Sequence, residues 1–369
     1  MTVRCGIVGL PNVGKSTIFN ALTAAGAQMA NYPFCTIEPN QGMVAVNDPR
    51  LNALTALLHP KRKIPAVMEF LDIAGLVRGA SKGEGLGNQF LGHIRQVEAI
   101  AHVVRCFIDD DITHVHNRVH PVDDIQVIDT ELMLADLASL EKRHKAVIQK
   151  ARSGEKEAKA MATLYETVMQ GLNDGMPVRR QKLTPADREM LRDLFLLTAK
   201  PVLYVCNVGE QEVAAAQQPG GSALVDAVRT IADAEGAGMV VICGAIEAEI
   251  SELGEDETRL FLQDLGLEES GLDRLVRSAF HLLGLMTFFT AGPQETRAWT
   301  IRQGSTAYDA AGAIHSDFQR GFIRAEVIAY ADYIACGSEL AAKEKGLMRV
   351  EGRDYPVVDG DIMHFRFNV

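Results

Sequence analysis

The stretch Gly9-Leu10-Pro11-Asn12-Val13-Gly14-Lys15-Ser16 decides how this chain folds. It fits the pattern G-x-x-x-x-G-K-[ST], in which glycines free the backbone so that successive N–H groups can surround phosphate oxygens. The apolar run Cys5–Val8 precedes the stretch and the helix-like run Thr17–Leu22 follows it. This order of strand, loop and helix predicts a phosphate-binding loop for a nucleoside triphosphate.

The residues of this loop have separate expected tasks. Lys15 is expected to neutralise the phosphates, which assigns it to catalysis as well as to binding. Ser16 is expected to ligate Mg²⁺, and the dipole of the helix that starts here adds attraction for the same anion. The predicted phosphate-binding set is Asn12, Val13, Gly14, Lys15, Ser16 and Thr17.

Composition limits the classes of protein to consider. A chain of 369 residues is long enough for two or three domains, and a net charge of −11 argues against coating of nucleic acid by the whole surface. The six cysteines have no metal-finger spacing, so we expect reduced thiols without a disulfide or zinc framework. Without an apolar run of membrane-spanning length, and with a strand close to the N-terminus, we expect a cytoplasmic protein, by default a monomer.

Short apolar runs separated by helical stretches predict a doubly wound α/β sheet. The expected strands are Cys5–Val8, Val67–Leu71, Val103–Ile108, Val202–Cys206 and Met239–Cys243. We assign residues 1–130 and 200–283 to this nucleotide-binding domain. Residues 284–369 are expected to form a small β-grasp-like α+β module.

Residues 131–199 differ in pattern and predict an inserted helical hairpin, with a coiled coil as one version of it. Leucines 132, 137 and 140 mark the outgoing helix, leucines 191, 194 and 197 mark the return, and the breaker cluster Gly171–Pro177 falls between them. Between Lys142 and Lys159 there are seven Lys or Arg against two Glu. The hairpin is therefore a basic arm on an acidic protein, although a solvated helix face is the simpler interpretation of any single lysine.

Two further segments are expected at the γ-phosphate. Asp72 ends an apolar strand and opens Asp72-Ile73-Ala74-Gly75, a D-x-x-G loop in which Gly75 senses the phosphate and Asp72 reaches Mg²⁺ through water. Thr36, in the loop 31–36, is a candidate to close on Mg²⁺ while the triphosphate is bound. The simpler alternatives are a strand-ending Asp that caps a turn and an ordinary loop hydroxyl.

The loop Asn207-Val208-Gly209-Glu210 bears on the choice of base. Guanine-specific proteins use Asn-Lys-x-Asp here, and the Asp accepts hydrogen bonds from guanine. Val208 replaces that Lys and Glu210 replaces that Asp, while adenine offers an acceptor on the corresponding edge, so a carboxylate has less to bind. We expect Asn207, Val208 and Glu210 near the base and ATP favoured over GTP, although one loop can relax a preference without reversing it.

Leu76 stands where many GTPases place the glutamine that orients the attacking water, and leucine cannot bind water. Hydrolysis is then slow or is assisted by another group. His114 is the candidate for catalysis because an imidazole can orient or deprotonate water near neutral pH. The alternative is a solvated surface histidine.

With these motifs, the chain resembles the YchF subfamily of Obg-like P-loop ATPases over nearly its whole length. The resemblance rests on residues 9–17, 31–39, 72–79, 207–210, 297–301 and 314–318. It implies a translation-factor-class nucleotide-binding domain, an inserted helical arm, a C-terminal TGS domain and ATP as the preferred nucleotide. It also implies that His114 substitutes for the missing glutamine.

The resemblance further implies association with ribosomes and a regulatory role in translation or stress. A basic arm and a TGS domain fit contact with ribosomal RNA through neutralised phosphates. Two functions follow as hypotheses: a switch that hydrolyses ATP slowly, and a nucleotide-gated module that docks on the ribosome while hydrolysis is incidental. An ordinary GTPase of the Obg type is the third.

Overall fold

The computed structural model describes residues 3–27, 40–73 and 86–368. The chain divides into two compact units, one formed by Met1–Met43 with Glu69–Ala279 and the other by Val44–Met68 with Phe280–Val369. This division differs from the domain bounds expected from the sequence at residues 44–68, which belong to the C-terminal unit.

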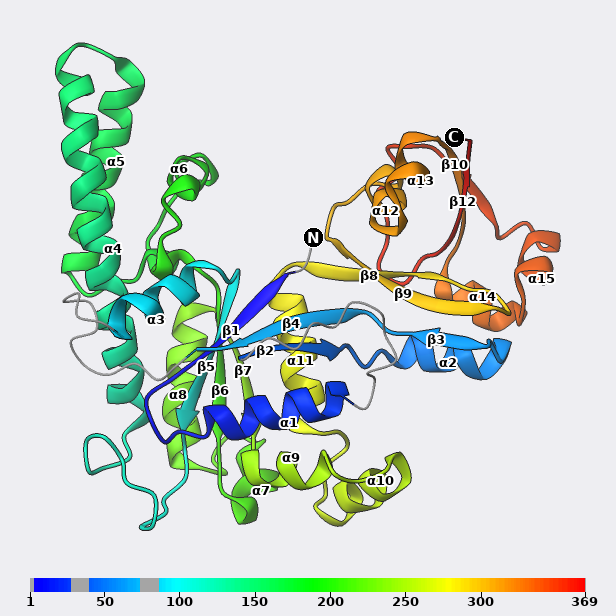
Figure 1. The fold of residues 1–369 in the computed structure, drawn as a ribbon, viewed down its shortest axis with the longest axis horizontal. Coiled ribbons are helices and arrows are strands. Elements are labelled where there is room, and N and C mark those ends of the chain that lie inside the picture. Colours follow the sequence, from blue (N-terminus) through cyan, green and yellow to red (C-terminus); the bar gives the residue numbers. More distant parts are fainter. Residues whose placement is uncertain (1–2, 28–39, 74–85, 369) are drawn as a thin grey trace. The chain divides into compact units, whose positions relative to one another are not determined.

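The first unit is built on a six-stranded sheet in the order β2-β4-β1-β5-β6-β7 (Figure 1). Its strands are β1 (Arg4–Val8), β2 (Gln41–Ala45), β4 (Val67–Asp72), β5 (Ala99–Arg105), β6 (Val202–Asn207) and β7 (Gly238–Ile242). Strand β1 is parallel to both neighbours, with Cys5 beside Phe70 and Ala99. The predicted α/β P-loop fold is confirmed, and the strand expected at 103–108 begins four residues earlier, at Ala99, and ends at Arg105.

Helices connect the parallel strands, as the predicted fold requires. Helix α1 contacts β1, α9 contacts α1, and α8 contacts β6 and β7. The helices of this part are α1 (Lys15–Ala27), α3 (Leu86–Arg95), α7 (Val213–Ala216), α8 (Ala223–Glu235), α9 (Gly244–Ile250), α10 (Glu255–Asp264) and α11 (Gly271–Leu282). The carboxyl ends of β1, β4 and β6 therefore meet at one edge of the sheet, where ligands bind in folds of this type.

The inserted arm is a helical hairpin of α4 (Pro121–Arg152) and α5 (Lys156–Asn173), which stands out from the sheet in Figure 1. Its turn lies at residues 153–155, so the expected position of the hairpin was wrong. The breaker cluster 171–177 ends α5 instead of dividing the hairpin. Spacings of four residues on α5, from Leu164 to Val168 to Leu172, place one apolar face against Leu140 of α4.

The segment after α5 does not form the expected second long helix. It contains short helical elements: η2 (Val178–Arg180), α6 (Pro185–Leu191), η3 (Arg192–Leu194) and η4 (Leu197–Ala199). Leu191 and Leu196 nevertheless pack in the same apolar cluster as Leu140. The leucines expected in a returning helix therefore lie in short elements that cover the base of the arm.

The C-terminal unit has its own six-stranded sheet in the order β11-β10-β12-β8-β9-β3. The strands are β3 (Arg62–Ile64), β8 (Leu285–Thr290), β9 (Glu295–Arg302), β10 (Phe322–Ile328), β11 (Arg349–Glu351) and β12 (Ile362–Phe367). The helices are α2 (Pro49–Leu58), α12 (Ala307–Ile314), α13 (Ser316–Arg320), α14 (Tyr330–Cys336) and α15 (Glu339–Glu344). Its core gathers Phe288, Val327 and Phe365 against α12.

Segment 44–68 is tied to this unit by charge as well as by strand pairing. Strand β3 pairs in parallel with β9, and the Arg50 guanidinium bonds to Asp48 and Asp359, each at 2.8 Å. The same guanidinium lies 5.4 Å from the centre of the Phe289 ring. These contacts explain why a segment from the first third of the chain belongs to the C-terminal unit.

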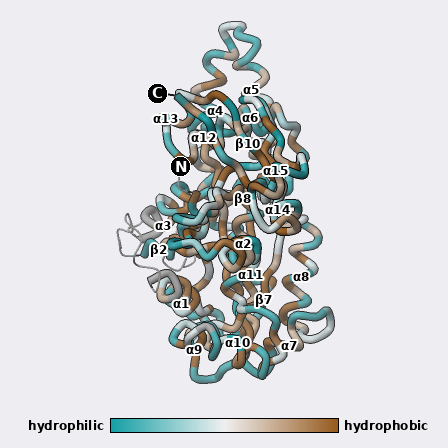
Figure 2. Tube along the Cα trace, turned by 90° about the vertical axis from the view of Figure 1, so that its right-hand side faces the viewer, coloured by the Kyte–Doolittle hydropathy of each residue, from teal (hydrophilic) through white to brown (hydrophobic). Residues whose placement is uncertain are grey.

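Hydropathy along the described chain alternates over short distances, including along α4 and α5 (Figure 2). Among the residues that the structure describes, none of the helices is both long enough and apolar enough to cross a membrane.

Candidate nucleotide-binding site

The phosphate loop connects β1 to α1 through a tight backbone path. Asn12 and Gly14 have positive φ angles of 61° and 96°. A Cβ atom on Gly14 would lie 2.2 Å from Nδ2 of Asn207, and one on Gly9 would lie 2.5 Å from the carbonyl oxygen of Val103. Glycine is required at both positions because neither the backbone angle at 14 nor the space at 9 and 14 admits a side chain.

Lys15 lies inside this loop, with 8% of the residue exposed. Its Nζ donates a hydrogen bond to the carbonyl oxygen of Leu10 at 2.7 Å. Burial lowers the pKa of the ammonium group to about 8, while the Asp72 carboxylate acts in the opposite direction. The cation is therefore held at the loop and close to the end of β4.

Asp72 and Ser16 lie together, as expected for a magnesium site. Ser16 is hydrogen-bonded to the Asp72 carboxylate, and burial raises the pKa of Asp72 against the lowering effects of Lys15 and Ser16. Its buried Oδ1 atom has no hydrogen-bond partner within the described residues. A hydroxyl and a carboxylate are ligands that suit Mg²⁺, and the unpartnered oxygen leaves capacity for a metal-bound water. Thr36 and Gly75, expected to complete this site, lie outside the described residues, as does Leu76.

Asn207, at the end of β6, ties the phosphate loop to the base-side loops. Its Nδ2 donates to the carbonyl oxygen of Val13 and its Oδ1 accepts from the backbone N–H of Gly244, both at 2.9 Å. Val208 is 2% exposed and its N–H bonds to Ile242, whereas Glu210 is exposed. The structure thus brings Asn207 to the loop as a brace, buries the Val208 side chain in the core and leaves Glu210 at the surface.

His114 lies between β5 and α4 and is only 5% exposed, so it is not a solvated surface histidine. Its Nε2 lies 3.0 Å from Oδ2 of Asp124, and its Nδ1 accepts a hydrogen bond from the His116 backbone N–H at 3.1 Å. The preceding carbonyl, of Thr113, accepts from Nδ2 of Asn12 at 3.0 Å. The loop that carries His114 is therefore attached to the phosphate loop.

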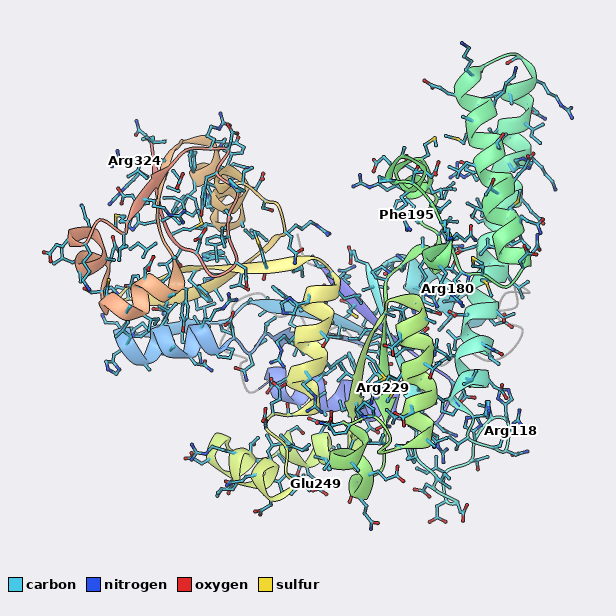
Figure 3. All side chains as sticks on the ribbon, turned by 180° about the vertical axis from the view of Figure 1, so that it is seen from behind. Arg118, Arg180, Phe195, Arg229, Glu249 and Arg324 are labelled. Atoms are coloured by element: carbon cyan, nitrogen blue, oxygen red, sulfur yellow. The ribbon has the colours of Figure 1, made fainter. Side chains whose placement is uncertain are left out.

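Arg105 holds the backbone of the loop that carries His114. The residue is 1% exposed, and its guanidinium donates to the carbonyl oxygens of Phe107, Asp109 and Ile112 at 3.0 to 3.2 Å. Its guanidinium carbon also lies 4.5 Å from the centre of the Phe107 ring. A buried cation thus fixes the path of the chain from β5 toward His114. Arg118, labelled in Figure 3, marks the outer part of the same loop, at the end of α4 opposite the hairpin turn.

Sequence reasoning missed Arg105, Asp124 and the Asn12 contact to Thr113. Asp124 is ten residues from His114 and meets it only because the loop folds back onto the first turn of α4. Two acidic residues after a proline look like ordinary first-turn residues of a helix, so the sequence carries no separate signal for this pair. The structure also places Gly244, the first residue of α9, against Asn207.

These features define a P-loop nucleotide hydrolase of the GTPase type. They are a strand, a phosphate loop with glycines, a buried lysine, and an acidic residue at the end of the neighbouring strand. Residues 4–126 match the family model MMR_HSR1, described as 50S ribosome-binding GTPase. Residues 285–368 match the model YchF-GTPase_C, described as "Protein of unknown function (DUF933)".

The chain belongs to the YchF family. It is 53% identical to the ribosome-binding ATPase YchF of Bacillus subtilis (strain 168) and to that of Escherichia coli O157:H7, in both cases over all of both chains. The solved structure of the Schizosaccharomyces pombe YchF GTPase superposes with a TM-score of 0.89 at 35% identity, covering 99% of this chain and 98% of that one. The resemblance drawn from the motifs is confirmed.

Proposed function

We propose that this protein is a ribosome-binding ATPase that hydrolyses ATP slowly and acts as a nucleotide-dependent switch in translation or stress response. The observation that carries the proposal is full-length identity of 53% to relatives named ribosome-binding ATPase YchF, joined to a loop in which Val208 and Glu210 replace the guanine-reading Lys and Asp. A location in the cytoplasm and a monomeric state follow as parts of the same proposal.

In this proposal each group near the phosphate loop has a defined task. The backbone of residues 12–17 and the Lys15 ammonium bind the phosphates, while Ser16, Thr36 and, through water, Asp72 would hold Mg²⁺. The bound ion would neutralise charge on the β- and γ-phosphates. Asn207, Val208 and Glu210 would surround adenine, with Asn207 acting through the backbone that it holds. Gly75 would sense the γ-phosphate.

His114 would orient the water that attacks the γ-phosphate. Its loop is attached to the phosphate loop through Asn12, which supports this assignment. Both imidazole nitrogens already have partners, so the loop must rearrange before either can bind water. Slow turnover in the absence of a partner is the expected consequence. Because both nitrogens of His114 are hydrogen-bonded, this arrangement also favours the second candidate, a nucleotide-gated docking module in which hydrolysis is incidental.

The ribosome contact would be made by the basic arm and the predicted TGS domain. The seven cations of the arm are exposed near the turn between α4 and α5, and within the described chain none of them forms an ion pair. They are Lys142, Arg143, Lys145, Lys150, Arg152, Lys156 and Lys159. Such a group suits phosphates of ribosomal RNA, with an affinity that falls as salt rises.

The test is calorimetric binding of ATP and GTP, with Mg²⁺, to the nucleotide-free protein and to a Val208→Lys, Glu210→Asp variant. We expect tighter ATP binding by the parent and a shift toward GTP in the variant. Tighter GTP binding by the parent would overturn the ATPase assignment and favour the GTPase alternative. Since Val208 is buried, a Glu210→Asp single variant serves as the control for misfolding.

A further inference from the structure

The hydrogen bonds of His114 determine which imidazole nitrogen carries the proton. The His116 backbone N–H can only donate, so Nδ1 of His114, 3.1 Å away, must present a lone pair. The proton of the neutral ring is then on Nε2, where it is donated to Oδ2 of Asp124 at 3.0 Å. An imidazolium is incompatible with this arrangement, because a proton on Nδ1 would face the N–H of His116.

The position of Asp124 on α4 places its carboxylate against His114. It lies in the first turn of α4, its side chain is 4% exposed, and its backbone N–H bonds to the carbonyl oxygen of His120 at 3.1 Å. Its second oxygen, Oδ1, has no hydrogen-bond partner among the described residues and lies 3.7 Å from Nδ1 of His116. An isolated buried charge is costly, so a buried carboxylate needs a hydrogen-bond donor. The Nε2–H of His114 is the chief donor to the Asp124 carboxylate.

A metal site is the competing interpretation of the same three side chains, whose ligand atoms lie within 4.8 Å of one another. A metal ion on Nε2 of His114 would displace the proton to Nδ1. That proton would then point at the His116 N–H, and two donors would face each other. The hydrogen-bond pattern therefore favours a proton, and not a metal ion, between His114 and Asp124.

We propose that Asp124 is a positioning residue for His114, which it fixes as the tautomer protonated on Nε2, so that Nδ1 is the nitrogen that meets the attacking water. The proposal rests on the function proposed above for His114. The residue that must move is His116, because its backbone N–H occupies Nδ1 in this structure. Asn117, with a φ of 54°, closes the turn that holds it, through a bond from its N–H to the carbonyl oxygen of His114.

Hydrolysis at this site requires one proton to leave the attacking water. The water oxygen forms a bond to the γ-phosphorus, and the bond from that phosphorus to the bridging oxygen breaks, so that ADP leaves with the electron pair. The water proton passes to Nδ1, while the proton on Nε2 stays hydrogen-bonded to the Asp124 carboxylate, which stabilises the imidazolium. Nδ1 then returns its proton to phosphate or solvent.

Within the described residues, the charged and titratable groups that face the pair come from its own loop, from the end of β5 and from α4. His114 and His116 face Asp124 from the loop, and both oppose the effect of burial, which raises the pKa of the Asp124 carboxyl. Cys106, after β5, also interacts with Asp124. Asp123, its neighbour on α4, points elsewhere, to Arg118 and His120. Asp123→Asn is thus a matched control, because it removes the same charge one residue away.

The first arm of the test needs no variant. In histidine-selective ¹⁵N spectra of the nucleotide-free protein, with His114→Ala used for assignment, we expect His114 to be protonated on Nε2. Protonation on Nδ1 would overturn the proposal.

The second arm compares steady-state ATP hydrolysis across pH. In Asp124→Asn, whose amide oxygen can still accept from Nε2–H, we expect kcat to fall by about tenfold or more with KM for ATP little changed. The acid limb of the kcat profile should move to lower pH, since loss of the carboxylate makes imidazolium harder to form. Asp123→Asn should match the parent. If Asp124→Asn also matches it while His114→Ala loses turnover, the proposal is wrong; if His114→Ala keeps turnover, the proposed role of His114 fails instead.

Discussion

The side-chain amide of Asn207 donates to the backbone carbonyl of Val13 at 2.9 Å and so joins the end of β6 to the middle of the phosphate loop. Its oxygen is bonded in turn to the N–H of Gly244. One buried side chain therefore sets the relative position of the loop that binds phosphate and the loops on the base side. Nucleotide affinity should depend on Asn207 whichever base is bound.

Asn207→Ala should weaken ATP and GTP binding together, by about tenfold or more, without changing their ratio. It leaves the buried N–H of Gly244 and the carbonyl of Val13 without partners, each of which costs about 1 to 3 kcal/mol. Calorimetry with both nucleotides measures this. Gln211→Ala, an exposed change next to the same loop, is the control for general damage; a selective loss of ATP alone would show that Asn207 reads the base directly.

Asp136 should be a main determinant of stability at the base of the arm. It is 2% exposed and accepts three hydrogen bonds, from the N–H groups of Leu197 and Thr198 and from the Thr198 hydroxyl, at 2.7 to 2.8 Å. Asp136→Ala should lower the free energy of unfolding by about 3 kcal/mol in urea titrations. The exposed Asp193→Ala should change it by less than about 0.5 kcal/mol. Equal effects of the two changes would contradict this role.

Glu247 should make stability depend on pH. It is 2% exposed, and burial raises its pKa from 4.5 to about 7, although the N–H groups of Gly271 and Leu272 act the other way. The folded state then binds more protons than the unfolded state between these values, so this residue lowers the free energy of unfolding as pH rises from about 4.5 to about 7.

Glu247→Gln removes that titration and keeps an oxygen for the bond that Glu247 accepts from Gly271. Its stability relative to the parent should therefore increase between pH 5 and pH 8, by on the order of 1 to 3 kcal/mol. Urea unfolding at the two pH values measures the change, with the exposed Glu249→Gln as control (Figure 3). A pH-independent difference between Glu247→Gln and the parent would show that the carboxyl does not titrate in this range.

The basic arm should contribute to ribosome binding through salt-sensitive contacts. Lys142→Ala with Lys145→Ala should weaken co-sedimentation with ribosomes and reduce the slope of log affinity against log salt by about 1.5 to 2. Arg95→Ala with Arg259→Ala removes two exposed cations of the first unit outside the arm and is the control. If both double variants bind alike at every salt concentration, the arm is not the contact surface.

The sequence was sufficient for the parts of the fold that local pattern determines. The phosphate loop, the buried strands beside it and the acidic end of β4 follow from residue type and spacing alone. The arm was misplaced because leucines 191, 194 and 197 match a helical period, although they cover the arm base as short elements. Helix α5 packs partly through small residues and a tyrosine, such as Ala158, Ala162 and Tyr165. These residues gave a weaker helical pattern in the sequence than the leucines did.

The surroundings of His114 could not be predicted for a different reason. Its partner Asp124, its supporting residue Arg105 and its link to Asn12 are contacts across loops, and no periodicity constrains loops. The sequence marked the imidazole as a candidate, but only the fold reveals that it is buried and that both nitrogens are occupied.

Single-turnover hydrolysis of ATP by the parent and by His114→Ala, with ATP affinity measured on the same samples, tests whether His114 orients the attacking water. We predict that the variant binds ATP as tightly as the parent and releases phosphate at least about tenfold more slowly. Equal phosphate release by the two proteins would show that the water is oriented without His114.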